Sequence, residues 1–129
     1  MFDFKNTKQQ GDAGLGDAIS YFTMNGVSVS LPLTDSQDYD LVIEMDSELK
    51  KVQIKTTSEK NPAGNPVVGL RLVGGNSKVN FVQKMAQDII YDFLYVLTDA
   101  GDRYFLPKSA IENITTKLTL GKKYIDYKI

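Results

Sequence analysis

Two strand-like segments lie only a few residues apart in the first half of the chain, and their closeness constrains the fold more than any other feature. Residues 39–45 and 51–56 are rich in strand-forming residues, and a short turn separates them. Segments joined in this way pair as antiparallel neighbours. Side chains alternate along a strand, so Gln53 and Lys55 share one face of the second segment. The sequence therefore predicts a hairpin with two long polar side chains on one face.

A helix is expected before this hairpin, over residues 6–25, with Asn6 or Thr7 as its cap. Its apolar stripe follows the spacing i, i+3, i+4 and i+7 and consists of Leu15, Ala18, Ile19 and Phe22. Three glycines in its first half each cost about 1 kcal/mol relative to Ala. Such a run predicts that another backbone, or DNA, approaches the helix closely.

The rest of the chain predicts more strands and a second helix. The expected elements are strands over 27–33 and 67–73, a helix over 79–91, a buried strand over 92–98, a strand over 103–107, one or two helical turns over 108–114 and an extended tail over 116–129. This order indicates an α/β fold with a mixed central sheet flanked by helices. We expect one domain, residues 1–129, which is an ordinary length for a single domain.

The absence of two residue types limits the chemistry. The chain has no Cys and no His. Thiol and imidazole nucleophiles, bases and metal ligands are therefore excluded, together with zinc fingers and Ser-His-Asp hydrolases. An enzyme built from this chain depends on carboxylates, Lys, hydroxyls and amides, and hard oxygen ligands of this kind suit Mg²⁺ or Mn²⁺.

Charge and hydropathy restrict the partners. The net charge of −1 argues against a non-specific coat on nucleic acid. No apolar run approaches the roughly 20 residues that span a bilayer, so we expect no membrane partner. The first residues lack the core of a signal peptide, and we expect a cytoplasmic protein.

The hairpin brings together residues suited to phosphodiester hydrolysis. That reaction needs a divalent ion to neutralise the phosphate, a water that loses a proton, and a cation to stabilise the developing charge. Asp40 offers a hard ligand, the backbone carbonyl of Ile54 a second one, and Gln53 a weaker amide oxygen. Lys55 can position or deprotonate the water. The same spacing also fits an ordinary hairpin whose polar residues only face solvent.

The first helix offers a further carboxylate, and the candidates are Asp12 and Asp17. With Leu15 at zero and about 100° per residue, Asp12 lies near 60°, beside the apolar stripe, and Asp17 lies near 200°, on the solvent side. We favour Asp12 as a catalytic and metal-binding residue. Lys8, one turn earlier, is a candidate phosphate contact.

Several polar residues after the hairpin are candidate DNA contacts through phosphates or base edges. They are Thr56, Thr57, Arg71, Asn76 and Lys78. For any single one of the last three, a solvated rim is the simpler explanation, and strand propensity explains the two threonines about as well as DNA contact does.

Longer stretches resemble a known family. The stretches KQQGDAGLGDAISYFTMNGVSVSLPLTDSQDYDLVIE, KKVQIKTT, YDFLYVLTDAGDRYFLPKSAI and LGKKYIDYKI are similar to PD-(D/E)XK endonucleases encoded in group I introns. Only residues from about 58 to 90 go unmatched. The resemblance implies a restriction-endonuclease-like core in αβββαβ order, and it puts the family's metal-binding Asp on Asp40, its Gln on Gln53 and its Lys on Lys55. Many relatives carry Glu in the first helix where this chain has Leu15.

The resemblance also implies a function. It leads us to expect a Mg²⁺-dependent endonuclease that cleaves double-stranded DNA, in the setting of intron homing, as a homodimer or homotetramer. One alternative is a Holliday-junction resolvase of the same fold. Another is a non-catalytic DNA-binding or assembly subunit, which the Leu at position 15 and the Gln at position 53 make credible.

Overall fold

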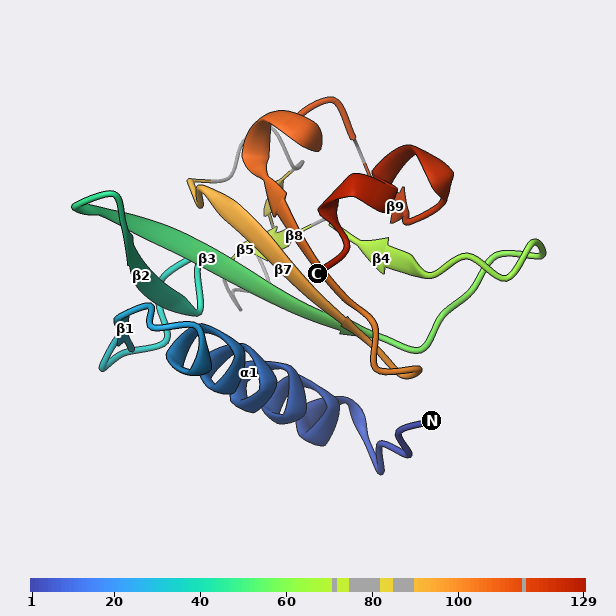
Figure 1. Ribbon diagram of the computed structural model, residues 1–129. Helices are drawn as coiled ribbons and strands as arrows, with labels where there is room; N and C mark the ends of the chain where they lie inside the picture. Colours follow the sequence, from blue (N-terminus) through green and yellow to red (C-terminus); the bar gives the residue numbers. More distant parts are fainter. Residues whose placement is uncertain (71, 75–81, 85–89, 115) are drawn as a thin grey trace.

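A five-stranded mixed sheet forms the centre of the fold (Figure 1). Its strands lie in the order β1 (Val29–Ser30), β2 (Leu41–Met45), β3 (Glu48–Thr57), β7 (Phe93–Thr98) and β8 (Arg103–Pro107). The computed structural model describes residues 1–70, 72–74, 82–84, 90–114 and 116–129. All neighbouring pairs of this sheet are antiparallel except β3 and β7, which run parallel.

The predicted hairpin is confirmed by β2 and β3. Asp46 and Ser47 form the turn between them, with φ of 53° and 66°, and two successive left-handed residues give the twist that suits a tight hairpin. The pairing runs from Met45 opposite Glu48 to Leu41 opposite Val52. Beyond Val52 the strand β3 continues with β7 on one side only, so its backbone is open toward the other side.

The helix α1 (Thr7–Met24) confirms the helix that the sequence predicts. Its cap is Asn6, whose side chain accepts a hydrogen bond from the backbone N–H of Gln9 at 2.8 Å. Figure 1 shows α1 along one face of the sheet, and its most buried residues are Gly14, Ala18 and Phe22. The predicted stripe is thus displaced, because Leu15 and Ile19 lie at the margin of the contact and are only partly buried.

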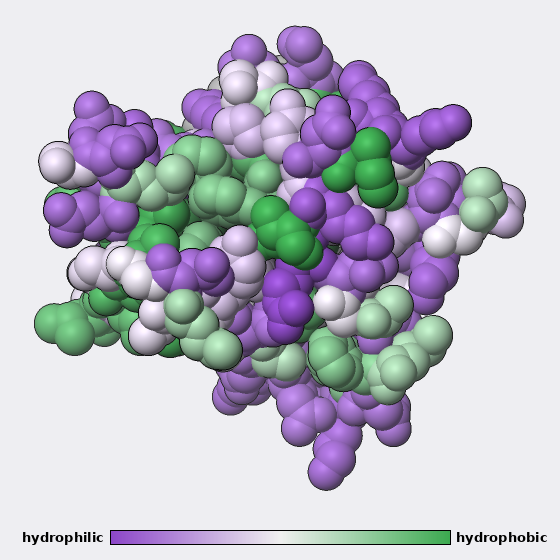
Figure 2. Space-filling model, viewed as in Figure 1, coloured by the Kyte–Doolittle hydropathy of each residue, from purple (hydrophilic) through white to green (hydrophobic). Residues whose placement is uncertain are grey.

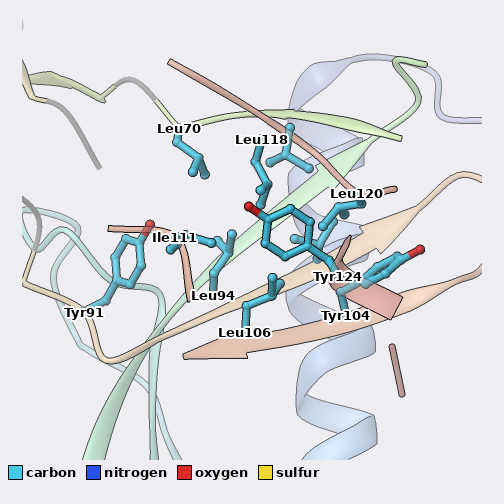
Figure 3. Close-up of a cluster of buried hydrophobic side chains, with 11 residues drawn as sticks. Leu70, Tyr91, Leu94, Tyr104, Leu106, Ile111, Leu118, Leu120 and Tyr124 are labelled. Atoms are coloured by element: carbon cyan, nitrogen blue, oxygen red, sulfur yellow. The ribbon is translucent and has the colours of Figure 1, made fainter. Parts of the chain in front are cut away.

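The opposite face of the sheet carries a second layer. It contains a two-stranded sheet of β4 (Val67–Gly69) and β9 (Lys117–Thr119), with 3₁₀ turns η2 (Lys108–Ala110) and η3 (Lys122–Tyr127). Between this layer and the central sheet lies a core of buried apolar side chains, shown in Figure 3. Burial on both faces explains why β7 is apolar along most of its length.

Four expectations from the sequence need correction. In place of the strand predicted over 67–73, the structure has β4, which pairs with β9, and a separate strand β5 (Leu72–Gly74), which pairs with β6 (Val82–Lys84). The strand predicted over 27–33 is reduced to β1, since Pro32 lacks the N–H that a longer ladder requires. Within the helix predicted over 79–91, the strand β6 forms instead, while 79–81 and 85–89 lie outside the described residues. The tail predicted as extended contains β9 and the turn η3.

The surface mixes residue types. Hydrophilic side chains dominate the outline of the face in Figure 2, and apolar ones show between them. Large apolar side chains that are most exposed include Met24, Leu33 and Leu49. Among the described residues, none of the helices has the length and apolarity to cross a membrane.

Candidate active site

Asp40 lies directly before β2, where the pairing between β2 and β3 ends. Its backbone N–H donates to the carbonyl of Val52 at 2.9 Å, and its carboxylate Oδ2 accepts from the N–H of Ile54 at 2.8 Å. The Asp40 carboxylate therefore accepts the hydrogen bond that a longer β2 backbone would accept from the Ile54 N–H. This contact fixes the carboxylate at the open edge of β3.

Gln53 and Lys55 lie on the same face of the sheet as Asp40. Val52 and Ile54 are buried against α1, so the alternating residues point to the other face. Gln53 and Lys55 are half-buried there, and Asp40 directly precedes Leu41, the residue of β2 that pairs with Val52. The structure thus brings together the three residues that the hairpin spacing predicts.

The carbonyl of Ile54 points toward the same edge. In a strand the N–H and C=O of one residue point to the same side, and the N–H of Ile54 meets the Asp40 carboxylate. Two residues further, the carbonyl of Thr56 accepts a hydrogen bond at 2.7 Å from the side-chain amide of Gln10 on α1. The Ile54 carbonyl therefore lies between two side-chain contacts along the edge that β2 leaves open.

Partial burial shifts the pKa values of Asp40 and Lys55. Partial removal of water from its carboxylate raises the pKa of Asp40, although the residue as a whole is exposed. The hydrogen bond from the Ile54 N–H and the positive charge of Lys55 oppose this rise. Burial lowers the pKa of Lys55, and the charge of Asp40 opposes that change. Each charge thus supports the other, and a cation beside Asp40 would further stabilise its ionised form.

Two cavities border these residues. One of about 240 Å³ is lined by Asp40, by Leu15 of α1 and by residues from the segment between β1 and β2, including Asp35 and Gln37. The other, of about 380 Å³, is lined by Lys55 and by residues of α1, β3 and β4. The helix position next to Asp40 is therefore occupied by Leu15, an apolar residue.

The two predicted helix carboxylates differ in their surroundings. Asp12 is exposed, and no described contact links it to Asp40. Asp17 was expected on the solvent side, which is wrong: it pairs with Arg103 at 2.6 Å and accepts a hydrogen bond from the hydroxyl of Tyr95 at 2.6 Å. The helix is rotated relative to the predicted stripe, so Asp17 flanks the buried face.

The pKa values around Asp17 reflect this contact. Burial alone would raise the pKa of Asp17, but the hydrogen bonds from Arg103 and Tyr95 outweigh it and hold the pKa below the ordinary value. Burial and the bond to Asp17 raise the pKa of Tyr95. This cluster therefore fastens α1 to β7 and β8 on the face away from Gln53 and Lys55.

The predicted DNA contacts divide into three groups. Lys8 is exposed on the first turn of α1. The hydroxyl of Thr56 is buried beneath Gly14. The hydroxyl of Thr57 donates to the carbonyl of Val67 at 2.6 Å. Neither hydroxyl is therefore at the surface, where a phosphate could contact it. The remaining candidates lie outside the described residues: Arg71, Asn76 and Lys78.

One residue of the site was missed by sequence reasoning. Gln10 reaches from α1 to the carbonyl of Thr56 and covers part of the open edge of β3. Nothing in its local sequence marks this role, because it depends on how α1 lies across a strand that is 46 residues away.

Comparisons with known proteins identify the family of this chain. A model of the family described as "PD-(D/E)XK endonuclease" matches residues 5–127. A solved structure, titled as that of the bacterial homing endonuclease I-Ssp6803I, is similar with a TM-score of 0.74 and 28% identity, over 91% of this chain and 79% of the other. A search of curated proteins found no match. The family match extends over nearly the whole chain, and this protein belongs to the PD-(D/E)XK endonuclease family.

Proposed function

We propose that this protein is a metal-dependent endonuclease that hydrolyses phosphodiester bonds of double-stranded DNA. The observation that carries the proposal is the position of Asp40 at the open edge of β3, with Gln53 and Lys55 on the same face. Family membership supports the nuclease activity. The choice of DNA, the metal and the biological setting belong to the proposal.

The donor set at this edge fits a hard divalent cation. The Asp40 carboxylate, the Ile54 carbonyl and the Gln53 amide offer oxygen atoms, which Mg²⁺ and Mn²⁺ prefer. When bound, such an ion neutralises charge on the phosphate and makes a water more acidic. Asp12 remains our candidate for a carboxylate contributed from α1, through its exposed position one turn before Leu15.

Lys55 has two properties that suit its proposed role. Its ammonium is partly buried and is stabilised by the charge of Asp40, and in such a place a positive charge acts strongly on a nearby phosphate. Because burial lowers its pKa, it also gives up a proton more readily than an exposed lysine. Lys55 can therefore orient the attacking water or stabilise charge on the phosphate, while Gln53 holds the position where many relatives carry an acid.

Intron homing is the biological setting that we propose. The similar solved structure is titled as a homing endonuclease, which supports this choice. A homodimer or homotetramer belongs to the same proposal, because a symmetric assembly can present one active site to each strand of the duplex.

The proposal is tested by incubating the protein with a DNA library and Mg²⁺ and sequencing the cleaved ends. We expect discrete cleavage sites for the wild type and at least a hundredfold loss in Asp40→Asn and Lys55→Ala, since each change removes a charge from the site. Lys50→Ala is the matched control, because Lys50 lies on the same strand but pairs with Glu48 at the hairpin end. Equal cleavage by all four proteins would remove the active-site assignment.

A non-catalytic DNA-binding subunit is a second candidate. Among the described residues, no group of three acidic, His or Cys side chains could hold a metal ion, and Leu15 occupies the helix position beside Asp40. This candidate predicts DNA binding without cleavage, with affinity unchanged in Lys55→Ala. Cleavage of a four-way junction without cleavage of its linear arms would instead indicate the resolvase.

A further inference from the structure

The cavity of about 380 Å³ next to Lys55 has a size and position that the site described above does not use. Residues from the first turns of α1, the end of β3 and the strand β4 line it. Its volume falls in the range of roughly 300–1,000 Å³ that is common for ligand pockets. Lys55 lines it, so the cavity and the Asp40 edge share one side chain.

The wall of this cavity favours an anionic, hydrogen-bonding occupant. Thr7 and Ser58 contribute hydroxyl groups and Lys55 contributes an ammonium. The acidic residue of the lining, Glu59, is paired with Lys117 at 2.7 Å. Lys117 offsets part of the charge of Glu59, and Lys55 is the cation of the lining.

We propose that this cavity is a subsite for the DNA phosphodiester next to the one that is cleaved. Its hydroxyls donate to the phosphate oxygens of that neighbouring group, and Lys55 lies between the two phosphates. This inference rests on the proposed function, which places the cleaved phosphate at Asp40. It assigns Thr7 and Ser58 to substrate positioning and leaves Thr56 and Thr57 in the structural roles described above.

Gly69 allows the subsite to be tested without substituting a residue of the proposed active site. It lines the cavity, and a Cβ at this position would have no heavy atom within 4 Å. It also lies in β4, opposite Lys117, where a β-branched residue suits the strand. Gly69→Ile should therefore fold normally and fill part of the cavity. Ser58→Ala, at an exposed position, removes one donor without adding bulk.

The experiment measures binding to a fluorescent mixed-sequence DNA duplex in EDTA, by anisotropy at several salt concentrations. We expect about tenfold weaker binding for Gly69→Ile. The slope of log K against log salt should fall, by up to about 0.9, because the phosphate of the subsite is displaced from Lys55. Ser58→Ala should weaken binding with the slope unchanged, because it removes a neutral donor. Gly16→Ala, on the exposed side of α1, is the control.

Cleavage with Mg²⁺ separates failure of the subsite from failure of the proposed function. If the wild type cleaves DNA and both variants bind with wild-type affinity and slope, the subsite is overturned while the nuclease stands. If the wild type binds without cleaving and the variants bind more weakly, the cavity is shown to bind a DNA phosphate, while the proposed nuclease function is overturned. A wild type that does not bind DNA overturns both. Should Gly69→Ile fail to fold by circular dichroism, unchanged binding by Ser58→Ala overturns the subsite.

Discussion

Neighbouring residues of α1 have very different surroundings. Gly14 packs on Thr56, Leu15 borders the cavity next to Asp40, and Asp17 pairs with Arg103. Gly16, between them, has open space around it. The glycines in this stretch therefore have separate reasons for their presence, and their substitution should have opposite effects.

Gly14→Ala should destabilise the protein by about 2–3 kcal/mol, as overpacking of a core contact does. A Cβ at this position would overlap the Thr56 hydroxyl, and the neighbouring side chain of Ile54 leaves little room to move. Gly16→Ala should instead stabilise it by roughly 0.5–1 kcal/mol, through the lower backbone entropy of the unfolded chain. Urea unfolding of both variants measures the difference, and equal stabilities would contradict the packing of α1 on β3.

Asp17 should make stability depend on pH in the acid range. Its folded pKa lies below the ordinary 3.8, so its contribution is complete above that pH and is lost as the pH falls through the folded value. Asp17→Asn should therefore lose about 1–3 kcal/mol at neutral pH, and the gap to wild type should narrow below about pH 3.8. Unfolding curves over a pH series measure this, with exposed Asp12→Asn as control. A constant gap at all pH values would exclude the proposed linkage.

At the scale of elements, sequence patterns succeeded where the interactions are local. The hairpin of β2 and β3 follows from a short turn between two strand-forming segments, and it brings Asp40 to Lys55. The rotation of α1 could not be predicted, because the partner of Asp17 lies 86 residues away in the sequence. Likewise Val82–Lys84 forms a strand where a helix was expected, since the pairing with β5 provides its hydrogen bonds.

The turn of this hairpin offers a prediction at the same scale. Ser47 adopts φ of 66°, a region that glycine occupies without the cost of a Cβ. Ser47→Gly should therefore stabilise the hairpin, by about 0.5–1 kcal/mol, despite the greater entropy of glycine in the unfolded chain. Thermal unfolding of Ser47→Gly and of the neighbouring control Glu48→Gly measures the effect. A loss of stability in Ser47→Gly, like that expected in Glu48→Gly, would contradict the left-handed turn.

At the scale of the whole molecule, the open edge of β3 links the site to the docking of α1. The pairing with β2 reaches only as far as Val52 of β3. Beyond it, the Asp40 carboxylate and the side chain of Gln10 on α1 form the hydrogen bonds to this edge of β3. Partial detachment of the helix would thus loosen this edge while the remaining sheet stays intact. On warming, DNA cleavage should accordingly be lost at a lower temperature than that of cooperative unfolding. Hydrogen exchange of the Ile54 amide should speed up before exchange in the rest of the sheet.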